Sequence, residues 1–396
     1  MDTYTLNIKD GRIVTANFLD EFGPAETVTS IVIPDGVQII DTYAFNGFKK
    51  LRSVKLPESL LEIGMLAFAQ CESLTEIDIP ASCLKLGSFC FLGCSSLTRV
   101  NLPEGITSIP DAAFMQCSKL KAIHIPESVT SLGRSAFTDC AELSDINIPK
   151  SVTHIGADCF CDCFSLEPDK DMLIYNNILC LYRGTDAAVT VPKHVTELSG
   201  AFSGNRYVKE INLHSGIQSI GEGSFGYCPS LERVDLPEGL REIGRDSFAQ
   251  CDSLKRITIP SSVTRIASYA FHRCSALESI ILPRSLKAIE DEVFTFCKSL
   301  SHITIYEGLE TIGNDVFSYC INLREITLPS TLKSIESQAF NGCFRLKKVV
   351  FEGKDCDIGD HAFEHRRKPT IYSQSGGSVE DHALKHGLSF VPLEQR

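Results

Sequence analysis

Phenylalanine recurs with a period of 23 residues along most of this 396-residue chain. A first series of anchors is followed, after one break, by a second series with the same spacing. The 14 anchors are Phe45, Phe68, Phe91, Phe114, Phe137, Phe160, Phe202, Phe225, Phe248, Phe271, Phe294, Phe317, Phe340 and Phe363. Such a period is typical of a solenoid, in which each repeat forms one coil and buries its apolar side chains only against neighbouring coils.

The residues that follow each anchor repeat as well. Cys stands three residues after the anchor in 11 of 14 copies, Leu follows after six, and an aliphatic pair around one polar residue then precedes Pro, as in Ile77-Asp78-Ile79-Pro80. This pattern predicts a very short strand, because Pro offers no N–H to a strand ladder. We expect these strands to pair in parallel from coil to coil, with the return segments packed behind them as turns or short helical pieces.

The spacing Phe-x-x-Cys-x-x-Leu-x-x-Ile-x-Ile-Pro resembles the 23-residue, BspA-type (Treponema-like) leucine-rich repeat over about residues 28–365. The resemblance implies an α/β leucine-rich repeat solenoid of about 14 coils, with a parallel β-sheet on the concave face and capped ends. Members of that family are mostly bacterial or protist surface proteins that bind host or matrix partners. The resemblance therefore implies a cell-surface protein with a role in adhesion.

The pattern divides the chain into five parts. We expect an N-terminal hairpin cap (1–27), a first block of repeats (28–166), an irregular hairpin insertion (167–200), a second block of repeats (201–365) and a C-terminal cap (366–396). In the insertion, Asn176-Asn177 suits a tight turn between strands at 172–175 and 178–182. The insertion is either a seam joining six coils to eight or a hairpin that a partner grips. In the last part, Ser378 is the expected N-cap of a short helix that Gly387 ends.

Composition restricts the partners and the compartment. A formal net charge of -12 without a long basic run argues against nucleic acid or an anionic membrane as partner. No apolar run is long enough to insert into a membrane. The first residues form no signal peptide, so we expect a cytoplasmic protein, or a surface or secreted one whose signal was trimmed. A monomer or weak self-association fits this composition.

The cysteines predict a buried ladder. The chain has 17 Cys, and 11 of them occupy the one repeated position. Equivalent side chains in adjacent coils lie about 4.8 Å apart, whereas disulfide Cβ atoms prefer about 3.8 Å. We therefore expect free thiols, which fit a reducing compartment. This expectation and the family resemblance point to different compartments, and both stay open.

No motif for catalysis, phosphate binding or metal-dependent hydrolysis occurs in the chain, so we predict a protein that is not an enzyme and holds no cofactor. Cys159, Cys161 and Cys163 could form a thiolate cluster, but packing explains them better. The pairs His361/His365 and His382/His386, with Cys356, could bind zinc if helical, but they complete no familiar ligand spacing. We therefore predict no metal site.

The polar strand positions beside the aliphatic pair form the candidate partner site. In a leucine-rich repeat they stand out from a rigid sheet and are preorganised for a broad protein contact. The candidates are Asn101, His124, Asn147, Glu210, Asn212, Arg233, Asp235, Arg256, Thr258, His302 and Thr304. Their simplest alternative is a solvated sheet face. The predicted function is a non-catalytic protein-binding scaffold, and the alternative is a cytoplasmic structural or self-assembling repeat protein.

Overall fold

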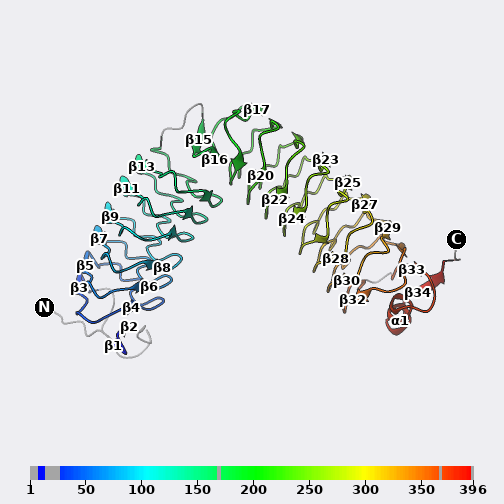
Figure 1. The fold of residues 1–396 in the computed structure, drawn as a ribbon, viewed down its shortest axis with the longest axis horizontal. Helices are drawn as coiled ribbons and strands as arrows, with labels where there is room; N and C mark the ends of the chain where they lie inside the picture. The colour runs from blue at the N-terminus through cyan, green and yellow to red at the C-terminus, as the bar shows by residue number, and fades with distance from the viewer. Residues whose placement is uncertain (1–7, 14–26, 167–170, 365–367, 394–396) are drawn as a thin grey trace. The chain divides into compact units, whose positions relative to one another are not determined.

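The computed structural model describes residues 8–13, 27–166, 171–364 and 368–393 (Figure 1). The chain forms two compact units, Met1–Asn176 and Asn177–Arg396. In each unit the chain winds into stacked coils that follow the 23-residue period. The structure therefore confirms the predicted solenoid, and the number of coils agrees roughly with the 14 anchors.

One strand of each coil is the short strand that the Ile-x-Ile pattern predicts. We call these the triplet strands, although the last three have four residues. They pair in parallel within separate sheets of two to four strands, with a shift of one repeat, as in Ile123 opposite Ile146. In the first unit they are β3 (Ser30–Val32), β5 (Ser53–Lys55), β7 (Glu76–Asp78), β9 (Arg99–Asn101), β11 (Ala122–His124) and β13 (Asp145–Asn147). In the second unit they are β17 (Ala188–Thr190), β19 (Glu210–Asn212), β21 (Arg233–Asp235), β23 (Arg256–Thr258), β25 (Ser279–Ile281), β27 (His302–Thr304), β29 (Glu325–Leu328), β31 (Lys348–Phe351) and β33 (Thr370–Ser373).

The return segments contain turns and a second series of strands, each two residues long. In both units of Figure 1 these strands lie along the edge of the ribbon opposite to the triplet strands. They are β4 (Ile39–Ile40), β6 (Glu62–Ile63), β8 (Lys85–Leu86), β10 (Ser108–Ile109), β12 (Ser131–Leu132), β14 (His154–Ile155), β18 (Glu197–Leu198), β20 (Ser219–Ile220), β22 (Glu242–Ile243), β24 (Arg265–Ile266), β26 (Ala288–Ile289), β28 (Thr311–Ile312), β30 (Ser334–Ile335) and β32 (Asp357–Ile358). Within the described residues the one α-helix is α1 (Ser378–Lys385), so the short helical pieces we allowed for are not found in the described return segments.

The core of each coil is built on the Phe and Cys positions. All 14 anchors are buried, and their rings stack from coil to coil, for example Phe91 on Phe114 with centroids 5.5 Å apart. Each of the 11 ladder thiols donates to the carbonyl oxygen of the anchor one coil earlier, as Cys117 Sγ does to Phe91 O at 3.3 Å. All 17 cysteines are free, and all except Cys161 are buried, which confirms the predicted ladder of free thiols.

The segment between the two blocks closes both stacks of Phe rings. β15 (Met172–Tyr175) belongs to the first unit, where the Tyr175 ring lies 5.4 Å from that of Phe160. β16 (Ile178–Tyr182) belongs to the second unit, where the Tyr182 ring lies 5.3 Å from that of Phe202. The connecting Asn176 and Asn177 both have positive φ, 47° and 64°, as a tight turn requires. Whether the insertion is a seam or a hairpin that a partner grips stays open, and the five domain boundaries stay predictions.

Both ends carry additional elements. At the N-terminus β1 (Ile8–Lys9) and β2 (Arg12–Ile13) form an antiparallel hairpin, and β2 continues in parallel into β4. The rest of the predicted cap at 1–27 lies mostly outside the described residues. At the C-terminus β33 pairs in parallel with β34 (Ser389–Pro392), and α1 lies between them in sequence.

The predicted N-cap of the C-terminal helix was wrong by one residue. Gly377 is the N-cap, and Ser378 is the first residue of α1. The Ser378 hydroxyl is already bound to the preceding coil, where it accepts from Cys356 N and donates to Cys356 O, both at 2.9 Å. Only Gly fits at 377, because a Cβ there would lie 2.2 Å from Lys354 O.

Candidate partner-binding site

The triplet face consists of the outward side chains of the triplet strands. In the second unit β23, β25 and β27 form a continuous parallel sheet. The middle residues, such as Ile257 and Ile280, are buried, so their neighbours on either side point outward. This register places Thr258, Ile281 and Thr304 in one row across three coils. The second row holds Arg256, Ser279 and His302.

Every predicted site residue lies on a triplet strand. Asn101, His124 and Asn147 belong to the first unit, and the other eight belong to the second. All are exposed except Glu210 and Asn212, which are half-buried. The structure therefore places eight of the 11 residues on two successive three-stranded sheets of the second unit, β17-β19-β21 and β23-β25-β27.

Several of these side chains already make hydrogen bonds or ion pairs within the protein. The Asn147 amide accepts from Ile125 N at 3.0 Å and donates to Ile125 O at 3.1 Å, so it extends the backbone ladder. The Arg233 guanidinium contacts Asp235 and Glu210. A partner could recruit these groups only by breaking the contacts they make, which makes them poor recognition elements.

Arg256 and Ile281 are exposed side chains on the triplet face of the second unit. Arg256 has one ion pair in the described residues, at 3.8 Å to Glu278, and its side chain is 79% exposed. Ile281 is 57% exposed although it stands on a rigid strand between two threonines. Ile281 belongs to a row of outward strand positions that the sequence predicts, but it was not among the predicted site residues. Its signal was an aliphatic residue at a strand position that is polar in most other coils, Val32 being another exposed exception.

Sequence reasoning also missed an aromatic strip of three rings, namely Phe296, Tyr319 and Phe344. Phe296 and Tyr319 follow their anchors by two residues and stack with centroids 4.6 Å apart and planes 2° apart. Phe344 meets Tyr319 edge to face at 6.4 Å. Tyr319 is 38% and Phe344 is 55% exposed. The signal in the sequence was an aromatic residue two positions after the anchor, where another coil carries Gly93.

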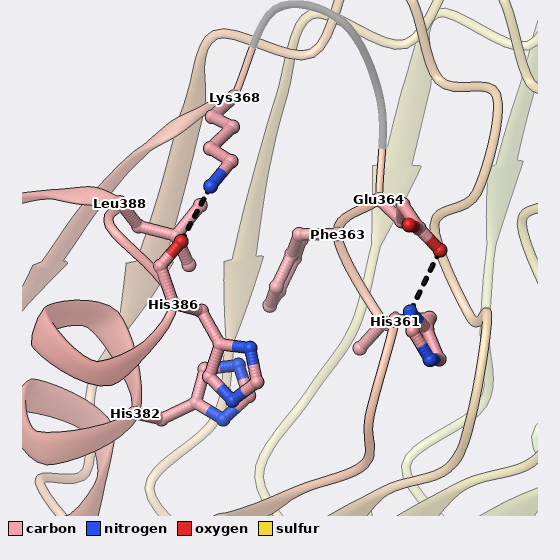
Figure 2. Close-up of a pocket in the computed structure, with 8 residues that line it drawn as sticks. His361, Phe363, Glu364, Lys368, His382, His386 and Leu388 are labelled. Atoms are coloured by element: carbon pink, nitrogen blue, oxygen red, sulfur yellow. Dashed lines mark hydrogen bonds and ion pairs between the residues drawn. The ribbon is translucent and has the colours of Figure 1, made fainter.

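The histidines of the C-terminal region line a small pocket of about 140 Å³ (Figure 2). His382 and His386 of α1 stack with centroids 4.3 Å apart, whereas His361 pairs with Glu364 at 2.7 Å. Burial, with His386 and Lys385 nearby, lowers the pKa of His382 to about 4, so the imidazole is neutral at physiological pH. Throughout the described residues no three His, Cys, Asp or Glu side chains are placed to hold a metal ion. His365 lies outside the described residues.

The cysteine cluster at the end of the first block is a packing feature. Cys163 belongs to the ladder and donates to Phe137 O at 3.0 Å, while Cys159 is buried before the anchor. Cys161 turns instead to the Asp162 carboxylate at 3.6 Å. Burial and the nearby Asp162 raise the pKa of Cys161 to about 12, so this thiol stays protonated, unlike a reactive thiolate.

Among the described residues the one α-helix, α1, has eight residues, which is too short to cross a bilayer.

The parallel coils, the ring and thiol ladders and the exposed triplet face define a solenoid repeat scaffold. The family model described as "BspA type Leucine rich repeat region (6 copies)" matches residues 20–117, 86–170, 186–295 and 241–370. The chain belongs to this leucine-rich repeat family. Among curated proteins none matches it.

Several solved structures are similar to the chain, and the first of those described here supports the solenoid fold. A leucine-rich repeat protein from Bacteroides ovatus is 23% identical, covers 99% of this chain and 98% of its own, and superposes with a TM-score of 0.50. A leucine rich cell surface protein from Faecalibacterium prausnitzii is 27% identical over 76% of this chain and 95% of its own, with a TM-score of 0.44. A leucine-rich repeat protein from Eubacterium ventriosum is 22% identical over 86% and 90%, with a TM-score of 0.47.

Proposed function

We propose that the chain is a non-catalytic scaffold that binds a protein partner through the triplet face of its second unit. The observation that carries this proposal is the exposed Ile281 at the end of β25, a strand paired on both sides, with the weakly paired Arg256 in the neighbouring coil. When a partner covers an exposed aliphatic side chain, the complex is stabilised by about 25 cal/mol per Å² of apolar surface removed from water.

The backbone supports recognition on this face. β25 is paired on both sides, with β23 and β27, so its outward side chains are fixed before a partner arrives. Little conformational entropy is then lost on binding. Thr258 and Thr304 flank Ile281 in its own row, and Arg256 and His302 stand in the second row, which is the arrangement of an apolar contact within a polar rim.

The family to which the chain belongs supports the adhesin-like version of this function, in which the partner is a host or matrix protein at the cell surface. A second candidate function is a structural or self-assembling repeat protein inside the cell. The 17 free thiols favour it, because disulfides form in oxidising compartments and thiols persist in reducing ones.

The test uses surface plasmon resonance of the full chain over a panel of purified matrix proteins, together with sedimentation velocity. The variant Ile281→Asp should weaken a matrix interaction by about tenfold or more, since burying an unpaired carboxylate costs several kcal/mol. The matched control is Val32→Asp, the same kind of change at the same repeat position in the first unit, where Val32 is 65% exposed; it should leave binding unchanged. Arg256→Glu should also weaken binding, and more than Arg233→Glu, because Arg233 is already paired.

Two outcomes would contradict the proposal. Binding that survives both Ile281→Asp and Arg256→Glu with unchanged melting would exclude the triplet face as the contact for that partner. Absence of any matrix interaction, with concentration-dependent growth of the sedimenting species, would favour self-assembly instead.

A further inference from the structure

The aromatic strip of the second unit is built by three consecutive coils. Phe296 and Tyr319 stand at equivalent positions and share a left-handed backbone, with φ of 61° and 58°, so their side chains leave the turn in the same direction. Their rings stack face to face. Gly342 occupies this position in the next coil, where a Cβ would lie 2.8 Å from Tyr319 Cδ1. The Tyr319 ring therefore lies across Gly342, and Phe344 stands beyond it.

The faces of the Phe296 ring are covered. The Arg273 guanidinium lies 5.1 Å from its centroid on the side of the preceding coil, and Tyr319 stacks on the side of the following coil. His272 meets the ring at 6.1 Å with planes 74° apart, so the part left for a ligand is the rest of the ring edge. The edge carries the positive end of the ring quadrupole. Such edges attract carboxylate and carbonyl oxygens more than the flat faces of sugars.

Phe344 connects the strip to a basic hollow of about 700 Å³. The hollow is lined by Arg324, Phe344, Arg345, Leu346, Lys347, Lys368 and Thr370. Four of these residues are cationic, and none of the seven is acidic. Arg345 donates to the Asn322 side chain at 2.6 Å, and Lys368 donates to His386 O, so two of the four cations are held in place by neutral groups. The charge of all four remains available to a ligand.

A second hollow of about 320 Å³ adjoins Phe296 at the other end of the strip. Its lining includes Arg273 and Lys298, but also Asp252, which accepts from Ser275 Oγ at 2.6 Å. The Asp252 carboxylate weakens the attraction of this hollow for anions. The charge along the strip therefore changes from mixed beside Phe296 to entirely positive beside Phe344.

We propose that the aromatic strip and the basic hollow together dock an extended acidic polypeptide segment that also carries apolar side chains. The concentration of cations on a chain of formal net charge -12 selects an anionic ligand. The half-exposed Phe344 and Tyr319 select one with apolar groups. A polypeptide that mixes Glu or Asp with Leu or Tyr offers both, whereas an anionic polysaccharide lacks the apolar side chains. These residues are separate from the proposed contact around Ile281.

The experiment measures fluorescence anisotropy of a labelled copolymer of glutamate and tyrosine titrated with the full chain. The double variant Arg345→Glu/Lys347→Glu should weaken binding by about tenfold or more, and salt should weaken wild-type binding. The matched control is Lys119→Glu/Lys121→Glu, which makes the same charge change at the same two repeat positions in the first unit. This control should leave the affinity within about twofold, as expected for a distant charge change.

A second pair of variants tests how much the Phe344 ring contributes to binding. Phe344→Ser should weaken copolymer binding by about tenfold, as for an aromatic side chain central to a contact. Phe164→Ser changes the same repeat position in the first unit, where Phe is 70% exposed and Asp162 lies two residues before it, and should have no effect.

Three results would overturn the proposal. The first is no binding of the copolymer at low salt. The second is equal binding of polyglutamate with no effect of Phe344→Ser, which would mean attraction by charge alone. The third is tighter binding of polygalacturonate than of the copolymer, which would identify a polysaccharide ligand. Substitutions around Ile281 should leave copolymer binding unchanged, so failure here and failure of the proposed function are distinguishable.

Discussion

At the scale of single residues, the thiol three positions after each Phe anchor explains why Cys recurs there. Cys is small and apolar enough for the interior, yet its S–H can donate to the carbonyl oxygen of the anchor in the preceding coil. Ala at this position would remove one of two donors to that carbonyl, because Phe91 O also accepts from Cys94 N at 3.2 Å. The loss of one intramolecular hydrogen bond typically costs about 0.5–1.5 kcal/mol. The same residue type thus packs the coil and pairs a backbone group of its neighbour.

The Phe anchor contributes more to the stability of each coil than the ladder thiol does. Phe114 is completely buried between the Phe91 and Phe137 rings. The variant Phe114→Ala should lower the free energy of unfolding by about 3–5 kcal/mol, because it removes buried area and leaves a cavity. Phe164→Ala, at an exposed Phe in the same unit, should change it by less than about 0.5 kcal/mol. Urea denaturation followed by circular dichroism measures both, and equal effects would contradict the stacked core.

Individual side chains were the part of the candidate site that the sequence predicted least well. The repeat pattern placed all 11 site residues on triplet strands, because strand alternation is a backbone property. It could not distinguish Arg233, which two carboxylates hold, from Arg256, which has one long ion pair. That distinction depends on side-chain directions across neighbouring coils.

At the scale of elements, the ladder of buried thiols makes the coils sensitive to alkali. Burial raises the pKa of Cys274 and Cys343 to about 12 from an ordinary value of 9.0. In the unfolded chain these thiols lose their protons as the pH passes 9, whereas in the folded chain they keep them. Each such thiol contributes its full stabilisation below pH 9 and loses about 1.4 kcal/mol per pH unit as the pH rises towards 12.

We therefore expect a steep loss of stability between pH 9 and 11, measured as the urea midpoint at a series of pH values. The triple variant Cys251→Ala/Cys274→Ala/Cys297→Ala should flatten this fall by about 4 kcal/mol per pH unit, because three thiols no longer titrate on unfolding. The quantity compared is the change in unfolding free energy per pH unit in the wild type and in the variant. A lower stability of the variant at neutral pH therefore does not affect the result. An unchanged slope would contradict the assignment of the effect to the thiols.

Elements were predictable where several residues carried the signal. The triplet strands follow from two aliphatic residues and a Pro, and the 172–175 and 178–182 strands from runs of four and five apolar or aromatic residues. The return strands have two residues each, too few to show a period of two. The N-cap at Gly377 was missed because the Ser378 hydroxyl binds Cys356 one coil earlier, a contact set by stacking.

At the scale of the whole molecule, the fold is a scaffold in which each coil is stabilised by its neighbours. The Phe rings, the thiol–carbonyl bonds and the parallel strands all join residues one repeat apart. Stability is then a sum of similar interfaces, and outward side chains can vary without loss of the core. This separation lets one chain carry both the proposed contact around Ile281 and the aromatic strip.

The cysteines of the solenoid core are buried free thiols and are not joined as disulfides. The most direct test alkylates the protein without reductant, first folded and then in denaturant, and counts the labels by intact mass. The structure predicts few labels on the folded protein and all 17 on the unfolded one. Labels missing in pairs after unfolding would mean disulfides, would contradict the thiol ladder, and would place the protein in an oxidising environment.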